Sequence, residues 1–458
     1  MADDTSPDVL VIGGGLAGIA TALRCADLGR SVTLVEGRPR LGGSAFSFTR
    51  GPLTIDNGQH VFLRCCTAYQ WLLRRVGAAG RTTLQPRLDI PVLHPDGRSA
   101  RLARTAGVPA PGHLSAALAR YGLLSPLDRV RAARGALALK LLDPADPGLD
   151  ARTLGEYLRQ HGQPSAVIER LWGVVATATL NQRPDDASLA LAAKVFRTGL
   201  LDRADAADIG YAAAPLGELH STLARQALAE AGVQVKLSHR VESVESGGGA
   251  VVLRHRGEQQ VLTPRVVVLA VPPREAFAAL PKLAASDAAA AQGLDTSPIV
   301  NVHVVYDRRV TDLDFGAAVD SPVQWFFDRT DSSGAAGAYP GSQYLAITVS
   351  AADDIIDVPS ARLRETYLTE LARLFPRARG AEVLDAFVTR ERHATFRQTS
   401  GTRALRPGPR TGLDGVCLAG AWTDTGWPDT MESAVRSGVR AAEEVAHVSA
   451  RDAMDFDR

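Results

Sequence analysis

The chain has 458 residues and nearly balanced charge, with 51 Lys and Arg against 50 Asp and Glu. It is longer than one average domain, so two or three domains are expected. Nucleic acid is not expected as a partner, because a nucleic-acid binder normally carries a clearly basic face and the formal net charge here is only +1. The 45% hydrophobic and 22% charged content is that of an ordinary globular protein.

The cysteines and the start of the chain bear on its compartment. Cys25, Cys65, Cys66 and Cys417 have no metal-ligand spacing and are too few for a disulfide framework, so no metal site is expected. The first residues are acidic and polar, unlike a signal peptide, and no run of about 18 apolar residues indicates a transmembrane helix. We expect a cytoplasmic protein, with a peripheral contact to the inner face of the plasma membrane left open.

The clearest motif lies at the start of the chain. A short β-branched run, Val9–Ile12, predicts a buried parallel strand, and residues 19–28 predict a helix. Residues 31–35 predict a second strand that ends in an acid, Glu36. The turn between the first strand and the helix has the GxGxxG pattern, formed by Gly13, Gly15 and Gly18.

These residues suit a bound dinucleotide. Gly13 permits the tight turn, Gly15 lets a pyrophosphate approach the helix N-terminus, and Gly18 lets the helix pack closely on the strand. Glu36 can accept hydrogen bonds from a ribose and would repel a 2′-phosphate, which favours FAD or NAD over NADP. Two further candidate cofactor contacts in the same turn are Leu16 and Ala17.

The residues after Glu36 favour FAD over NAD. The candidate contacts in this stretch are Gly37, Arg38, Arg40, Gly42, Gly43 and Ser44. With them the sequence resembles the FAD-dependent amine oxidase and phytoene desaturase superfamily, which continues GxGxxG with an acid, a basic residue and Gly-Gly-Arg. NAD enzymes do not usually carry this extension. Ser44 stands where the family has arginine, so the resemblance implies that one phosphate contact is missing or is supplied by Arg40.

A second cofactor motif lies near the C-terminus. Residues 415–419 predict a strand, 420–426 a loop, and 431–442 a helix whose N-terminal amides can stabilise negative charge on a reduced flavin. This arrangement resembles the C-terminal FAD motif of the superfamily, although Ala421 stands where the family has Asp and Asp424 is a candidate substitute. The cofactor contacts implied by the resemblance are Gly420, Ala421, Met431, Glu432 and Ala434.

The middle of the chain has weaker signals. A helix over 215–231 precedes short predicted strands at 233–235, 240–244, 251–253 and 266–270. The resemblance implies that the chain re-enters the nucleotide domain here and that the backbone of Val241 contacts adenine, although Val241 also suits a core strand. Predicted strands that would roof a substrate cavity lie at 301–306, 323–328 and 344–350, and a helix near 361–374 and a strand near 382–390 follow them.

Residues 113–142 have apolar positions at helical spacing, interleaved with basic residues. Such a basic amphipathic helix suits an anionic membrane surface, but it also suits an ordinary surface helix with a solvated face. Residues 151–200 are predicted to be helical as well.

The expected fold class is therefore α/β: a Rossmann-like FAD-binding domain with an inserted α+β substrate domain, of the amine oxidase and phytoene desaturase type. The FAD-binding domain would combine residues 1–95, 213–272 and 400–448. The substrate domain would combine 96–212 and 273–399, and its helical part is the one left open as membrane-facing.

The stretch Asp56-Asn57-Gly58-Gln59-His60 resembles the hydroxysqualene dehydroxylases within this superfamily, as do residues 171–188 and 422–428. Such enzymes reduce hydroxysqualene to squalene with reduced FAD in hopanoid biosynthesis. The resemblance implies a long apolar isoprenoid substrate. It also implies an external electron donor or reductase, because no second GxGxxG for NAD(P)H is present. Gly58, Gln59 and His60 are candidate cofactor contacts.

This chemistry needs an acid to protonate the leaving oxygen or a site that stabilises an allylic cation. His60, with a pKa near neutral, is the candidate acid, Asp56 would orient it, and Asp424 is a third candidate. Alternatively, Asp56 only shapes a turn and His60 only binds the cofactor. Candidate substrate contacts, whose large side chains suit a core equally well, are Phe62, Trp172, Asn181, Trp422 and Trp427.

Three other functions stay open. A carotenoid or phytoene-type desaturase would run the flavin in the opposite direction, and an amine oxidase would oxidise a different substrate class. A prenyl-lipid carrier of the GDP-dissociation-inhibitor type would bind lipidated proteins without redox chemistry. The intact glycines, Glu36 and the C-terminal motif favour a retained flavin over the carrier.

Overall fold

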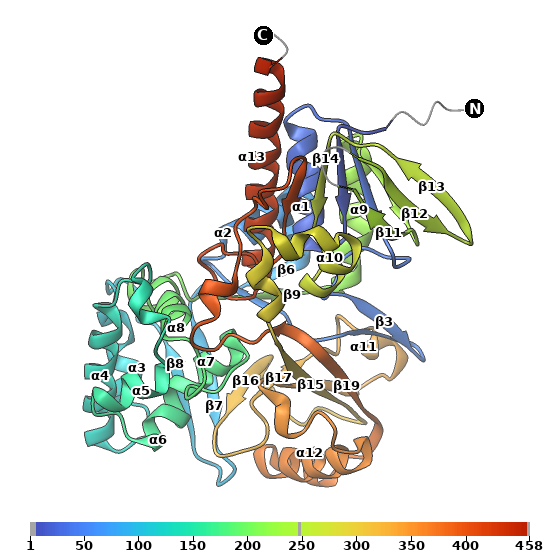
Figure 1. Ribbon diagram of the computed structural model, residues 1–458. Helices are drawn as coiled ribbons and strands as arrows, with labels where there is room; N and C mark the ends of the chain where they lie inside the picture. The colour runs from blue at the N-terminus through green and yellow to red at the C-terminus, as the bar shows by residue number, and fades with distance from the viewer. Residues whose placement is uncertain (1–5, 246–248, 456–458) are drawn as a thin grey trace.

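The computed structural model of the protein describes residues 6–245 and 249–455, so the first acidic residues of the chain lie outside it. Its elements form two lobes, one above the other in Figure 1. The upper lobe contains a parallel sheet flanked by helices, and the lower lobe contains a mixed sheet beside a group of helices. The predicted α/β class, with a Rossmann-like sheet and a mixed substrate-domain sheet, is confirmed, whereas the predicted domain boundaries stay a prediction.

The parallel sheet is assembled from distant parts of the chain. Its strands lie in the order β10 (Gln234–Leu237), β2 (Val32–Glu36), β1 (Val9–Ile12), β14 (Val266–Leu269) and β20 (Val416–Leu418). Each neighbouring pair is parallel. Because parallel strands end at the same edge, the GxGxxG turn after β1, Glu36 at the end of β2 and Gly420 after β20 share one edge of the sheet.

The two helices of the cofactor motifs lie side by side. Helix α1 (Leu16–Asp27) packs along α13 (Met431–Asp455), as Figure 1 shows. The approach is close because Gly438 presents no side chain, and the Thr21 hydroxyl donates to the Gly438 carbonyl at 3.2 Å. The other elements around the parallel sheet are α2 (Thr67–Arg75), α9 (Ala224–Glu230), α10 (Pro273–Ala279), β11 (Arg240–Val244), β12 (Val251–His255) and β13 (Glu258–Leu262).

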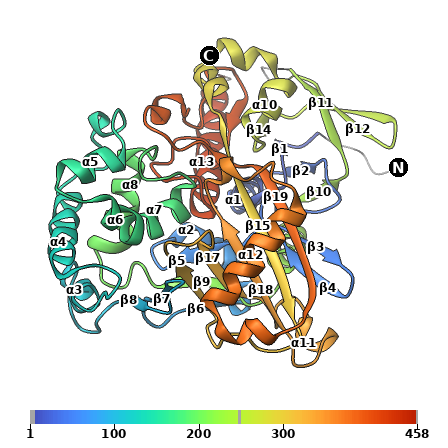
Figure 2. The same ribbon diagram turned by 90° about the horizontal axis from the view of Figure 1, so that it is seen from below.

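The mixed sheet forms the second lobe. Its strands lie in the order β19 (Val383–Phe396), β15 (Thr296–Tyr306), β18 (Gln343–Val349), β17 (Trp325–Asp328), β16 (Phe315–Ala318), β7 (Asp89–Leu93) and β8 (Ser99–Ala103). Helix α12 (Ser360–Leu374) covers one face of this sheet (Figures 1 and 2). The short helix α11 (Ala335–Ala338) follows β17 and packs on β18. The remaining small strands are β3 (Ser47–Arg50), β4 (Leu53–Asp56), β5 (Val61–Leu63), β6 (Thr82–Leu84) and β9 (Ile209–Ala212).

The remaining helices stand beside the mixed sheet. The predicted helix over 113–142 is broken into two, because the chain turns after Ala119 and restarts where the Ser125 side chain caps a helix that opens with proline. In the described ranges, no helix is both long and apolar enough to cross a membrane. The helices beside the mixed sheet are α3 (Ser115–Ala119), α4 (Pro126–Lys140), α5 (Leu154–Gln160), α6 (Ser165–Val167), α7 (Gly173–Leu180) and α8 (Leu189–Phe196).

Candidate functional site

The glycine turn after β1 is built to bring two backbone segments together. Gly13 has φ +112°, and a Cβ on Gly18 would lie 1.9 Å from the Gly13 carbonyl oxygen, so helix α1 can approach the strand only at a glycine. The Gly42 amide donates to the Gly14 carbonyl at 2.8 Å. A Cβ on Gly43 would lie 2.8 Å from the Gly15 Cα. The two glycine segments of the sequence motif therefore line one narrow space.

Glu36 closes one end of this space. Its carboxylate accepts hydrogen bonds from the Gly14 amide at 2.7 Å and from the Arg38 amide at 2.8 Å. The His239 amide donates to the Glu36 carbonyl at 3.0 Å, which brings the start of β11 to the same point. Val241, two residues further, is half-buried and packs against the main core cluster.

The arginines of the motif stand over the second glycine segment. The Arg40 guanidinium donates to the Gly43 carbonyl at 3.2 Å and lies 3.5 Å from the Phe46 ring centroid. Burial and the positive charge of the nearby Arg38 lower the pKa of Arg40. A bound phosphate would offset this positive charge. Ser44 is exposed, and its carbonyl accepts from the Asn57 amide group at 2.9 Å.

Asn57 ties this loop to the second lobe. Its side chain accepts from the Phe46 amide at 3.0 Å and donates to Glu391 on β19 at 3.0 Å. Its carbonyl accepts from Asn301 on β15 at 2.9 Å. The Asp-Asn-Gly segment is thus a joint between the cofactor loop and the mixed sheet, which fixes Gly58, Gln59 and His60 between the lobes.

A small cavity lies at this joint. Its walls are Asp56, Gln59, His60, Val61, Tyr211, Ala212, Leu216, Phe327 and Arg329. The Gln59 Nε2 is buried without a hydrogen-bond partner in the described part of the chain. The pKa of His60 falls to about 4 because burial disfavours the imidazolium, which corrects the near-neutral value expected from the sequence. His60 is therefore a neutral imidazole at pH 7.

Asp56 lines the same cavity, but its carboxylate is already bonded to other groups. Its carboxylate accepts from the Ser47 hydroxyl at 2.6 Å and the Leu216 amide at 2.9 Å. It also pairs with the buried Arg329 at 3.0 Å. Within residues 6–245 and 249–455, no hydrogen bond joins Asp56 to His60, so in this structure the carboxylate holds Arg329 rather than orienting the imidazole.

The sequence predicted a strand over 323–328 that roofs a substrate cavity, but it did not identify the aromatic residues Tyr211 and Phe327 that line this cavity. Tyr211 on β9 packs edge-to-face against Phe315 at 5.7 Å, and Phe315 stacks on Phe327 at 6.0 Å. Trp325 continues the row at 6.2 Å from Phe327. The alternating pattern of β17 was a usable signal, because alternate residues of a strand face the same side.

Arg406 holds the C-terminal loop in place, and the sequence analysis did not identify it. The buried Arg406 donates to the carbonyls of Ala421 at 3.1 Å and Thr423 at 2.6 Å. Gly420 has φ +145° and lies against the Trp422 indole, whose Nε1 donates to the Val271 carbonyl at 3.0 Å. Ala421 thus presents its carbonyl to Arg406.

Two aspartates of this loop, Asp424 and Asp429, have different hydrogen-bond partners. Asp424 accepts from the Gly426 amide at 2.9 Å and forms a local turn. Asp429 accepts from the Phe396 amide at 2.8 Å, and burial raises its pKa to about 6. Asp429 can therefore hold a proton near neutral pH.

In the first turn of α13, the Glu432 side chain bonds to the neighbouring helix α2. The Glu432 carboxylate accepts from the Ala68 and Tyr69 amides at 3.1 and 2.8 Å and so caps α2. Only the backbone of Glu432 is left to face a cofactor. Met431 and Ala434 are half-buried in the same turn.

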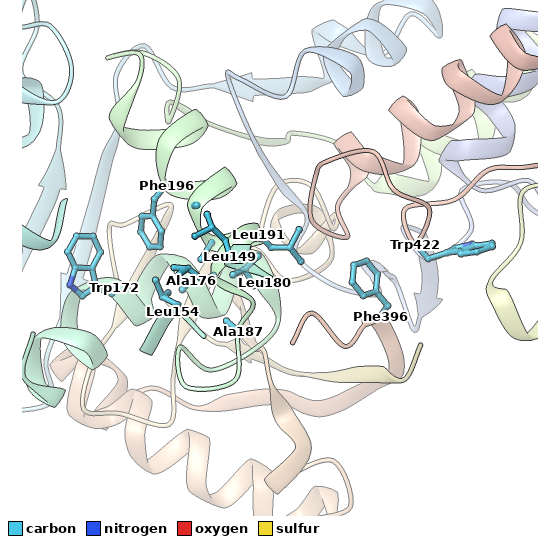
Figure 3. Close-up of a cluster of buried hydrophobic side chains, with 14 of the residues drawn as sticks. Leu149, Leu154, Trp172, Ala176, Leu180, Ala187, Leu191, Phe196, Phe396 and Trp422 are labelled. Carbon is cyan, nitrogen blue, oxygen red and sulfur yellow. The ribbon is translucent and has the colours of Figure 1, made fainter. Parts of the chain in front are cut away.

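The predicted substrate contacts do not form one group. Trp427 is half-buried between Lys194 at 4.8 Å and Arg436 at 4.9 Å from its ring centroid. Trp172 is buried against Phe196, and Figure 3 shows it at the opposite end of the apolar cluster from Trp422.

Phe62 and Asn181 are also internal. Phe62 packs edge-to-face on Tyr69 at 5.3 Å, over Gly210. The Asn181 side chain accepts from the Ala351 amide at 2.6 Å and donates to the Ser297 carbonyl at 3.1 Å, so it ties α7 to the sheet.

The residues present fit a bound FAD. The first turn of α1 starts at Gly15 with no side-chain cap and no acid, so its amides can receive a pyrophosphate. The Glu36 carboxylate at the end of β2 would accept hydrogen bonds from a ribose, and the unpaired Gln59 Nε2 would supply a donor between the lobes. The fold and this site define a dinucleotide-dependent oxidoreductase.

Comparison with known proteins agrees. A family model for flavin containing amine oxidoreductases matches residues 16–446, and the chain belongs to this family. It is an FAD-dependent oxidoreductase, related to hydroxysqualene dehydroxylases and carotenoid desaturases.

Individual relatives cover almost the whole chain. The chain is 30% identical to the hydroxysqualene dehydroxylase of Rhodopseudomonas palustris, covering 96% of this chain and 98% of the relative. It is 25% identical to a zeta-carotene desaturase of Arabidopsis thaliana, covering 95% and 84%. A triple mutant of putrescine oxidase shares the fold, with a TM-score of 0.72 and 18% identity, covering 96% of this chain and 99% of that one.

Proposed function

We propose that the chain is a reductive dehydroxylase that converts hydroxysqualene to squalene. The observation that carries this proposal is the near-full-length likeness to hydroxysqualene dehydroxylases, which exceeds the likeness to the desaturases. Two aromatic side chains that line the cavity, Tyr211 and Phe327, support it, because aromatic faces stabilise an allylic cation. Reduced FAD, when bound, supplies a hydride.

The chain's own residues then have three tasks. Tyr211 and Phe327 flank the cavity and would face the positive charge that develops as the hydroxyl leaves. The neutral His60 would hold the leaving hydroxyl by a hydrogen bond rather than protonate it, since its pKa is about 4. The proton that leaves with the hydroxyl as water would come from an acid outside the cavity wall. Asp429 is the candidate, since its pKa of about 6 keeps part of the population protonated near neutral pH.

Electrons must come from outside, since the sequence contains a single GxGxxG motif. We infer a separate reductase or a diffusing donor as partner.

The test uses anaerobically reduced holoprotein mixed with hydroxysqualene, with flavin absorbance and product mass followed together. Flavin reoxidation matched by squalene formation is the expected result. Absence of reoxidation would overturn the proposal, and the oxidised protein would then be tested with phytoene-like polyenes, since the carotenoid desaturases are the next relatives.

Two substitutions separate the proposed roles. His60→Ala should abolish turnover while most of the flavin stays bound, and turnover like that of the wild type would remove His60 from the mechanism. Asp429→Asn should remove the basic-side fall of kcat near pH 6 together with most of the activity, whereas Asp424→Asn, in the same loop, should leave the pH profile in place.

A further inference from the structure

The outer face of α4 carries an exposed apolar row. Leu127 is 59% exposed, Val130 60%, Leu137 56% and Leu141 86%. Their spacing of three, seven and four residues places them on one side of a helix. From Leu127 to Leu141 the row extends about 20 Å along the helix axis, at 1.5 Å per residue.

This row is distinct from the face that builds the core. Ala132, Gly135 and Leu139 are buried on the opposite side, where α4 contacts α8. The helix is therefore apolar on both sides, unlike the amphipathic helix that the sequence pattern predicted. An apolar row that the fold itself leaves uncovered marks an interaction surface.

Basic side chains accompany the row. Arg134 lies on the same side, between Val130 and Leu137, and its exposed side chain forms no ion pair or hydrogen bond within the described ranges. Arg131 is half-exposed and pairs with Asp128 at 2.9 Å. Arg120 is exposed at the end of α3, which contacts α4.

The position of α4 suits a large flat partner. Figures 1 and 2 both show α4 at the outer edge of the helical part, with its long side facing away from the molecule. On its inner side, α4 contacts α8, and α8 carries Lys194 against Trp427 of the C-terminal loop. Helices α4 and α8 thus lie between the exposed row and the C-terminal loop.

We propose that the outer face of α4 docks on an anionic lipid bilayer. The apolar row would enter the boundary between headgroups and acyl chains, and Arg134 would meet lipid phosphates. A second copy of the chain is the less favoured occupant, because a two-fold interface on this row would bring the Arg134 side chains of both copies together. The use of this contact for substrate uptake rests on the proposed function, whereas the contact itself does not.

The experiment is vesicle flotation of the FAD-loaded protein. Vesicles of phosphatidylcholine alone are compared with vesicles in which about one third of the lipid is phosphatidylglycerol. The double variant Val130→Ser with Leu137→Ser should lower the partition coefficient at least about tenfold. Its two serines would bury much less apolar surface in the bilayer than the native side chains. The matched control is Val261→Ser on β13, whose side chain is 58% exposed in the other lobe.

The charge is tested separately. Arg134→Gln should weaken binding to the anionic vesicles about threefold to fivefold, with a smaller effect at high salt. Arg362→Gln, an exposed arginine on α12, should leave binding unchanged.

Three results would overturn the proposal: no binding of the wild type to anionic vesicles, equal binding by the double variant, or a wild-type dimer that the double variant dissociates. The last result would assign the row to a second copy. Turnover of detergent-dispersed substrate should be the same in the double variant and the wild type. A protein that binds vesicles but forms no squalene would refute the proposed function and leave the docking face intact.

Discussion

At the scale of single residues, the glycines of the nucleotide turn serve two different needs. Gly18 is required by the fold, because its Cβ would lie 1.9 Å from the Gly13 carbonyl oxygen. Gly15 is not, because its φ is −74° and the nearest atom to an added Cβ would be the Gly43 Cα at 3.7 Å. The space in front of Gly15 is therefore kept for a ligand.

We expect Gly15→Val to fold but to lose FAD. The added methyl groups would occupy the space where a pyrophosphate approaches the first amides of α1, so FAD affinity should fall at least about tenfold. Flavin absorbance of the purified protein and circular dichroism of both apoproteins are the measurements. Gly18→Ala is the contrasting variant and should lower the yield of folded protein. Full flavin occupancy in Gly15→Val would show that the pyrophosphate lies elsewhere.

The site was predictable from the sequence where its residues are close together in the chain. The glycine turn and Glu36 belong to one local strand-turn-helix-strand unit, so spacing alone brought them together. Arg406 and Asp429 could not be found in this way. A buried arginine that binds loop carbonyls, and a carboxyl whose pKa burial raises, owe their roles to packing against distant segments.

At the scale of elements, the start of α13 stabilises a second helix. Glu432 caps α2 by accepting from two of its first amides, and it also pairs with Arg436 at 2.7 Å. Amides at a helix N-terminus have no partner within their own helix, so a carboxylate from a neighbouring element can replace a local cap. The two helices are thereby coupled at the edge of the cofactor motif.

Glu432→Gln should lower the free energy of unfolding by about 1–3 kcal/mol, because the amide group can accept at only one oxygen and leaves Arg436 without its buried partner. Chemical denaturation of the apoprotein measures the change. Glu443→Gln, at an exposed position further along α13, is the control and should change stability by less than about 0.5 kcal/mol. Equal stability of Glu432→Gln and the wild type would contradict the capping role.

Element prediction succeeded where one pattern dominates and failed where two compete. The β-branched run of β1 and the alternating run of β18 lie within a residue or so of their predicted positions. The segment 113–142 has helical spacing throughout, yet the chain turns between α3 and α4, and α4 is apolar on both sides. The strand β13 was missed because its Glu-Gln-Gln start is polar on an exposed three-stranded sheet.

At the scale of the whole molecule, each lobe contains a buried neutral histidine. His220, near the glycine segments, has its pKa lowered to about 4, and His303, in the mixed sheet, to about 3, in both cases mainly by burial. His220 is hydrogen-bonded to Tyr69 at 2.8 Å, and His303 to Tyr344 at 2.7 Å and Thr389 at 3.0 Å. Lowering the pH should therefore destabilise both lobes.

Stability should fall as the pH falls from about 6.5 towards 4. In this window the unfolded chain takes up protons that the folded His220 and His303 do not, and the same holds for His60, so each of the three contributes a slope of about 1.4 kcal/mol per pH unit. Asp429 acts in the opposite direction below pH 6, because its raised pKa lets the folded state bind a proton first, and it offsets about one histidine. His303→Gln keeps a donor and an acceptor but removes one titration, so it should flatten the slope by about 1.4 kcal/mol per pH unit whatever its effect at pH 7. Urea unfolding of both proteins across this range measures the two slopes, and parallel curves would mean that His303 is already protonated in the folded state.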